Sequence, residues 1–96
     1  MVGISMSYRI DFTKSAQKAI KKLAKSNPVR FHKLTEVLDS IVSNPRSGIG
    51  HPEALKGGNG VTWSRHISAH DRIIYDIYDD VVTVIVLEVE GHYNDK

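Results

Sequence analysis

The order of two hydrophobic periodicities constrains the fold of this chain more than any other feature. Apolar residues first recur at helical spacing along two segments, and then alternate with polar residues along three later segments. A period near 3.6 indicates amphipathic helices, whereas a period of two indicates strands. Helices followed by strands predict an α+β fold in which two N-terminal helices pack on one face of a twisted antiparallel sheet.

Local signals set the approximate limits of the helices. Residues 8–12 alternate as a short first strand, and Thr13 or Ser15 can cap the helix that follows. Asn27-Pro28 is a typical start for the second helix, and Asn44-Pro45 predicts its end. The apolar stripes predicted to face the core are Ala16, Ala19, Ile20, Leu23 and Ala24, then Phe31, Leu34, Leu38, Ile41 and Val42.

The sequence after the helices begins with a loop. Residues 44–60 contain two prolines and five glycines, with Leu55 as a candidate strand start. Three strands are predicted at 61–67, 72–78 and 81–89, with Asp79-Asp80 at the turn of the last hairpin. The glycine-rich stretch 57–60 lacks the glycine-lysine-serine/threonine ending of a phosphate loop and is predicted to be a turn.

Length and composition exclude several classes of protein. The 96 residues suit one domain with a modest core, and residues 1–96 are predicted to form it. No apolar run is long enough to cross a bilayer, and no signal peptide is apparent at the N-terminus. Without cysteine there is no disulfide scaffold, so a reducing cytoplasm is the expected location. No set of histidines and carboxylates has zinc-like spacing, so no metal or cofactor is predicted.

The net charge of +2 is small, so the distribution of charge is more informative than its sum. Eight basic residues lie between Arg9 and Lys33, and acidic residues gather after Asp76. The early lysines have two interpretations, a solvated helix face or a surface that contacts RNA or the ribosome.

Strand parity predicts which side chains share a face. Matching the apolar sides of segments 61–67 and 72–78 leaves His66 and Arg72 together on the more polar face. That match joins Trp63 and Ile67 with Ile73, Tyr75 and Ile77. In the last strand, one side carries Val82, Val84, Val86, Glu88, Glu90 and His92. If that side faces away from the helices, Glu88, Glu90 and His92 join His66 and Arg72, and the open face is expected to be a basic, histidine-bearing surface.

Four short motifs, in order, resemble the YoeB (Txe) toxins of the RelE superfamily. They are Gly50-His51-Pro52-Glu53-Ala54-Leu55-Lys56, Trp63-Ser64-Arg65, His70-Asp71-Arg72-Ile73-Ile74-Tyr75 and His92-Tyr93. The resemblance implies a RelE-like, microbial ribonuclease-like fold and a toxin of a toxin-antitoxin pair. It implies cleavage of messenger RNA in the ribosomal A site without a metal. The implied partners are the ribosome, messenger RNA, a YefM- or Axe-like antitoxin and a second copy of the chain, with no membrane.

The resemblance also implies roles for individual residues. Glu53 falls on the family's catalytic glutamate as general base, Arg72 on its catalytic arginine, and His92 on its near-terminal histidine as general acid. Lys56 and Arg65 match basic positions beside the site, and Tyr93 matches the closing tyrosine. His66 is a departure, because the family pattern has a second arginine there.

The implied chemistry suits these residue types. The RNA 2′-hydroxyl attacks the adjacent phosphorus and leaves a 2′,3′-cyclic phosphate and a free 5′-hydroxyl. This reaction needs a base for the 2′ proton, an acid for the leaving oxygen, and cations around the phosphate. Arg72, with Arg65 and Lys56, is predicted to bind that phosphate, and Tyr93 or His66 can stack on an exposed base.

Alternatives remain at the level of both residue and function. Arg65 can instead pair with Asp76 or Glu88 across the sheet, and Trp63 is interpreted as a core residue rather than a base-stacking one. The alternative functions are a non-enzymatic superfamily member that poisons DNA gyrase, an antitoxin co-repressor, and a free-standing ribonuclease. Glu53 together with His92-Tyr93 favours cleavage over protein binding. Little cutting of naked RNA is expected, because the proposed base is weak and the ribosome is expected to orient the substrate.

Overall fold

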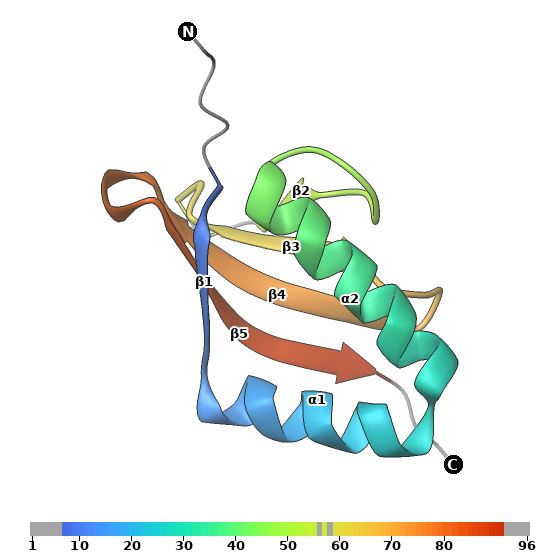
Figure 1. Ribbon diagram of the computed structural model, residues 1–96. Coiled ribbons are helices and arrows are strands. Elements are labelled where there is room, and N and C mark those ends of the chain that lie inside the picture. Colours follow the sequence, from blue (N-terminus) through green and yellow to red (C-terminus); the bar gives the residue numbers. More distant parts are fainter. Residues whose placement is uncertain (1–6, 56, 58, 92–96) are drawn as a thin grey trace, which may run out of the picture.

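The computed structural model describes residues 7–55, 57 and 59–91, and its elements follow the predicted order of a strand, two helices and then strands (Figure 1). None of the helices in this described part has the length and apolar composition needed to cross a membrane. The elements are β1 (Arg9–Phe12), α1 (Lys14–Ser26), α2 (Pro28–Ser43), β2 (Glu53–Ala54), β3 (Thr62–His66), β4 (Asp71–Tyr78), the 3-10 turn η1 (Asp79–Val81) and β5 (Thr83–Gly91).

The five strands form one sheet in the order β1-β5-β4-β3-β2. Both helices pack on one face of it, and the other face is left open (Figure 1). The α+β prediction is therefore confirmed. The sheet is antiparallel from β2 to β5, whereas β1 runs parallel to β5. A parallel neighbour is possible because two helices and three strands separate β1 from β5, which frees the pair from hairpin geometry.

The predicted helix starts are confirmed. The Thr13 side chain accepts a hydrogen bond from the Ala16 amide, and Asn27 caps α2 through the Arg30 amide with Pro28 in the first helical position. Each side-chain oxygen satisfies one of the amide groups that a helix start leaves without a partner. The helix α2 ends at Ser43, directly before the predicted Asn44-Pro45 stop.

The core lies between the helices and the covered face of the sheet. Its centre contains Leu23 from α1, Ile41 from α2 and Tyr75 from β4, each at most 2% exposed. The parity prediction for β3 and β4 is confirmed, because Trp63 lies opposite Tyr75 and packs against this core. Among the described residues, the buried apolar set is Ala16, Leu23, Leu34, Val37, Ile41, Ile67, Ile73, Tyr75, Ile77, Val84, Val86 and Val89.

The strand β5 departs from the predicted alternation. Val86 lies opposite Tyr75 but Glu88 lies opposite Ile74, so Leu87 is an extra residue in the ladder. This bulge reverses the parity of the strand. Val84 and Val86 therefore face the helices, whereas Glu88 and Glu90 face the open side, and the prediction that all four share one side is wrong.

The long loop and the last turn also differ in detail. The short strand in the loop is Glu53–Ala54, so Leu55 follows a strand rather than starting one. The turn before β5 extends from Asp79 to Val81 and ends at Val82, which has a left-handed φ of 47°.

Candidate active site

The open face of the sheet carries a row of polar side chains at one end. The ladder places His66 of β3 opposite Arg72 of β4, and Arg72 opposite Glu90 of β5. Directly opposed residues in an antiparallel sheet share a face. Arg72 Nε donates to Glu90 Oε1 at 3.1 Å, and both side chains remain more than 40% exposed. The predicted pairing of His66 with Arg72 is confirmed.

Glu53 lies on the same face, one row away. It is exposed in β2 and pairs with Ser64, whose neighbours across the sheet are Ile74 and then Glu88. Strand spacing and residue rise put the Glu53 and Arg72 backbones roughly 12 Å apart. Two long side chains at that distance can reach opposite sides of one phosphodiester. A general base and a phosphate-binding group that act on the same substrate require such an arrangement.

Three predicted site residues, Lys56, His92 and Tyr93, lie outside the described residues. His92 follows Gly91 directly in the sequence, and Gly91 lies opposite Asp71 at the end of β5. Their roles stay predictions.

A shallow hollow of about 500 Å³ opens beside the row. Its polar lining comes from His66, His70, Asp71, Arg72 and Glu90. Among these, Asp71 is 1% exposed and its carboxylate pairs with Arg30 of α2 at 2.9 Å. This pair attaches the start of β4 to α2, so one wall of the hollow is held by the helix layer.

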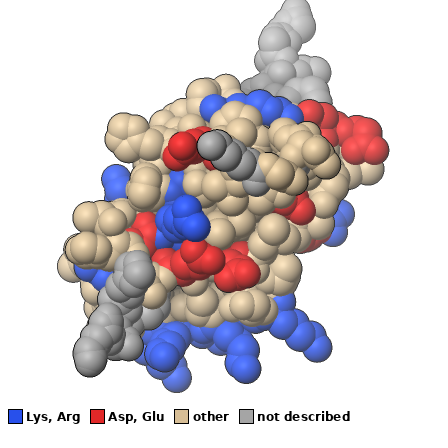
Figure 2. Space-filling view, turned by 180° about the vertical axis from the view of Figure 1, so that it is seen from behind, with Lys and Arg blue, Asp and Glu red and all other residues tan. Residues whose placement is uncertain are grey.

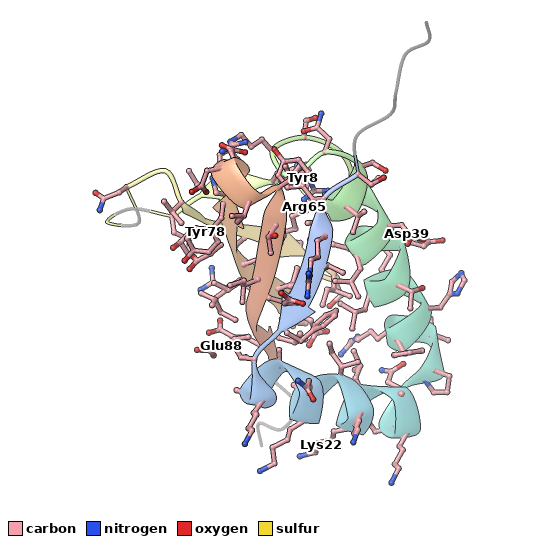
Figure 3. The ribbon with its side chains drawn as sticks, turned by 60° about the vertical axis from the view of Figure 1, so that its left-hand side comes forward. Tyr8, Lys22, Asp39, Arg65, Tyr78 and Glu88 are labelled. Carbon is pink, nitrogen blue, oxygen red and sulfur yellow. The ribbon has the colours of Figure 1, made fainter. Side chains whose placement is uncertain are left out.

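The permanent charge of the open face is acidic among the described residues. Its arginines are Arg9 and Arg72, and they are outnumbered by the carboxylates on the same face, which belong to Asp11, Glu53, Asp76, Glu88 and Glu90. Figure 2 shows red groups around a single blue group in the middle of this face, whereas blue groups gather at the lower edge. In Figure 3, Glu88 lies on the side of the sheet away from α2. The expectation that Glu88 and Glu90 join His66 and Arg72 on this face is confirmed. The expectation that the face is basic is wrong for the described residues, because its carboxylates outnumber its arginines.

Arg65 occupies the opposite face. It lies across from Ile73 and is 0% exposed, so it reaches neither a phosphate nor the carboxylates of Asp76 and Glu88. Both predicted roles of Arg65 are therefore wrong. The signal was present in the sequence, because the parity that places Trp63 and Ile67 in the core places Arg65 there too.

The buried guanidinium of Arg65 uses all five of its N–H groups. Nε donates to the Tyr75 hydroxyl, Nη1 to Ser40 Oγ and the Ile49 carbonyl, and Nη2 to the carbonyls of Asn44 and Ser47. Asn44 is the C-cap of α2, where helix carbonyls carry partial negative charge that offsets the buried cation. Arg65 thus holds the end of α2 and residues 44–49 against β3.

Gly50, the residue after this anchored part of the loop, lies directly against β3. The His66 amide donates to the Gly50 carbonyl at 2.7 Å. Gly50 has a φ of +85°, and a Cβ on it would lie 2.7 Å from the His66 carbonyl oxygen. Only glycine fits this approach, which aligns the chain for the β2–β3 pairing that presents Glu53.

Together these side chains provide a carboxylate, a guanidinium and an imidazole on one exposed surface. A carboxylate can accept a proton, and a guanidinium can bind a phosphate with its planar fork. In the part of the chain that the structure describes, no group of three or more histidines and carboxylates is placed to hold a metal ion. The surface is suited to acid-base chemistry on an anionic substrate.

Sequence comparison identifies relatives across most of the chain. Residues 12–93 match the family described as the YoeB-like toxin of bacterial type II toxin-antitoxin systems. Toxin YoeB of Mycobacterium bovis is 39% identical over 61 residues, which cover 64% of this chain and 69% of that protein. Toxin YoeB of Streptomyces coelicolor is 29% identical over 85 residues, which cover 88% of this chain and 99% of that protein.

Solved structures give the same result. The YoeB dimer from Staphylococcus aureus superposes with a TM-score of 0.77 at 28% identity, covering 91% of this chain and 99% of that one. The YoeB chain of the YoeB-YefM complex from the same organism gives 0.76 at 30% identity, covering 90% of this chain and 98% of that one.

Proposed function

The chain belongs to the YoeB-like toxins of bacterial type II toxin-antitoxin systems, and from that membership we propose that it is an endoribonuclease that cleaves messenger RNA in the ribosomal A site. The observation that supports this proposal is the presence of Glu53 and Arg72 on the same open face of the sheet. They come from separate strands, and each coincides with a catalytic position of the family's motifs.

In the proposed reaction Glu53 accepts the proton of the 2′-hydroxyl as its oxygen attacks the phosphorus. Arg72 binds the phosphate, where negative charge builds up in the transition state. Its contact with Glu90 uses Nε, so the two terminal nitrogens can turn toward the substrate. His92 donates a proton to the leaving 5′-oxygen. The products are a 2′,3′-cyclic phosphate and a 5′-hydroxyl, and because RNA supplies the nucleophile the reaction needs no metal ion.

The ribosome enters the proposal for a physical reason. Glu53 is exposed on a two-residue strand, and a solvated carboxylate is a weak base. Much of the rate must therefore come from holding the 2′-oxygen, phosphorus and leaving oxygen in line. A messenger fixed in the A site is already constrained in this way, whereas free RNA must lose conformational entropy first.

The same membership supports proposals about protein partners. The Staphylococcus aureus relative is known both as a dimer and in complex with YefM. We expect this chain to bind a YefM- or Axe-like antitoxin that neutralises it, and to form a homodimer. Copurification with the antitoxin encoded beside it, and light scattering of the free toxin, test these two expectations separately.

The decisive experiment measures cleavage of messenger on programmed ribosomes, with free RNA alongside. The wild type should cut on ribosomes, and Glu53→Gln and His92→Ala should each lower the rate by about 10²–10⁴-fold. Glu88→Gln is the matched control, because Glu88 is an exposed carboxylate on the same face and ladder row as Glu53. If the wild type arrests growth yet cuts nothing, the nuclease proposal fails, and binding to gyrase or another protein becomes the explanation.

A further inference from the structure

A second histidine, His51, lies in the polar row, and the proposed mechanism does not use it. The rings of His51 and His66 are edge to face, with centroids 6.5 Å apart and planes at 75°. Both side chains are exposed. The row therefore continues across four segments of chain as His51, His66, Arg72 and Glu90.

The backbone at His51 is held in an unfavourable conformation. Its φ is +53°, in the left-handed region that side chains rarely adopt. Pro52 follows it, and a residue before proline favours an extended backbone. Gly50, directly before, also has a positive φ and is fixed by the amide of His66. Strained residues of this kind gather at functional sites, where surrounding contacts maintain them.

The permanently charged groups around His51 and His66 supply too little positive charge to neutralise a bound phosphate. From β4 comes Arg72, which Glu90 of β5 already offsets at 3.1 Å. From β2 comes the Glu53 carboxylate. The β3–β4 connection contributes His70, and the first residue of β4 is Asp71, which is buried against Arg30. Among these described groups the permanent charge sums to no net cation, so further positive charge must come from imidazoles.

We propose that His51 and His66, when protonated, form a subsite that binds an RNA phosphodiester beside Arg72, so that RNA binding strengthens as pH falls. Histidine is the side chain that gains a positive charge in the range just below neutrality. Each protonated ring adds a donor with formal charge, which is the stronger class of hydrogen bond to phosphate. This subsite deepens the nuclease proposed above and rests on it.

The test uses the full chain and a 2′-O-methyl oligoribonucleotide, which cannot be cleaved because its nucleophile is blocked. Dissociation constants are measured at about pH 5.5 and about pH 8, on either side of the usual histidine transition. The wild type should bind at least about tenfold more tightly at the lower pH, the effect expected of a charged hydrogen bond. Imidazole carbon resonances of His51 and His66 should shift when the oligonucleotide is added.

Three variants test whether the pH dependence of RNA binding comes from His51 and His66. The double variant His51→Gln, His66→Gln should lose the advantage at low pH, and the double variant His51→Arg, His66→Arg should bind tightly at both values. His32→Gln is the control, because His32 is an exposed histidine of α2 that contacts Glu36 at 3.4 Å. It should behave as the wild type does. Thermal unfolding of every variant checks that the exposed substitutions leave the fold intact.

Equal wild-type affinity at the two pH values overturns the subsite, and it is the result that stacking of neutral rings on a base would give. Retention of the full pH dependence by the double glutamine variant also overturns it. Cleavage on ribosomes by wild type and Glu53→Gln tests the nuclease itself. A protein that binds the oligonucleotide with the expected pH dependence but cleaves nothing refutes the nuclease and leaves the phosphate subsite standing.

Discussion

Arg65 and Arg72 lie on adjacent strands and face opposite sides of the same sheet. Arg65 is fully buried and donates to five oxygen atoms, none of which belongs to a carboxylate. Arg72 is half-exposed and donates to the carboxylate of Glu90. The two faces thus use the same side chain differently: Arg65 holds the loop of residues 44–49, whereas Arg72 keeps its charge at the solvent-exposed surface.

The difference between the faces is a difference in solvation. A guanidinium out of water must replace every lost water contact, so its geometry is fixed and its loss is costly. A guanidinium at the surface keeps its hydration and can exchange a carboxylate for a phosphate at little cost. Four changes, in decreasing order of their expected effect on the free energy of unfolding, test this comparison.

The largest effect is expected for Arg65→Ala. It leaves the carbonyls of Asn44, Ser47 and Ile49 without donors and opens a cavity, so the free energy of unfolding should fall by about 3–5 kcal/mol. Urea unfolding followed by circular dichroism measures it. Arg9→Ala is the control, since the Arg9 side chain is 75% exposed and its loss should be nearly neutral. A loss under about 1 kcal/mol for Arg65→Ala would show that the buried network contributes little.

A smaller effect is expected for Tyr75→Phe. The Tyr75 hydroxyl accepts from Arg65 Nε at 3.0 Å and donates to the Pro45 carbonyl at 2.7 Å. Its removal leaves both partners buried and unsatisfied, which should cost about 1–3 kcal/mol. Burial raises the pKa of Tyr75, so the free energy of unfolding of the wild type should fall as pH rises through the range in which tyrosine ionises. The fall should be larger for the wild type than for Tyr75→Phe, which has no hydroxyl to ionise at this position. Tyr78→Phe, at an exposed tyrosine that donates to Asp76, is the comparison and should change urea stability by less than about 0.5 kcal/mol.

Arg72→Ala should separate stability from function. Its exposed pair with Glu90 is expected to contribute less than about 1 kcal/mol to the free energy of unfolding. Cleavage on programmed ribosomes should nevertheless fall by about 10²-fold or more, because a transition-state contact is lost. Equal activity of Arg72→Ala and wild type would remove Arg72 from the proposed mechanism.

The smallest effect is expected at the far end of the sheet. The Arg46 guanidinium, and then the Tyr8 hydroxyl, hydrogen-bond to Asp79 and lower the pKa of its carboxyl below the ordinary value of about 3.8. A lowered pKa stabilises the fold above that value, and the contribution is lost as pH falls through the folded-state pKa. The difference in melting temperature between wild type and Asp79→Asn should be small near neutrality and vanish in acid. Asp80→Asn is the control, because it removes the exposed neighbouring carboxylate of the same turn and leaves the contacts of Asp79 with Arg46 and Tyr8 in place.

Much of the fold and part of the site follow from local sequence patterns. Thr13, Asn27 and Pro28 mark helix starts because capping depends on residues within one turn. His66 and Arg72 could be paired because they belong to one hairpin, in which apolar matching determines the register. Glu53 was found only through its motif, since nothing in a two-residue strand distinguishes it from a solvated glutamate.

The sequence by itself determined the order of elements, most of the helix positions that face the core and the faces of the β3–β4 hairpin, because each depends on short-range periodicity. The predicted stripe of α2 missed Val37, which is fully buried. The tertiary structure decided the face of Glu88 and Glu90. Thr13 bonds the carbonyls of Val86 and Leu87 at the bulge, a contact across more than 70 residues that no local pattern encodes. It also decided the role of Arg65, because five acceptors from α2, β4 and residues 44–49 meet around its guanidinium only after the helices pack on the sheet.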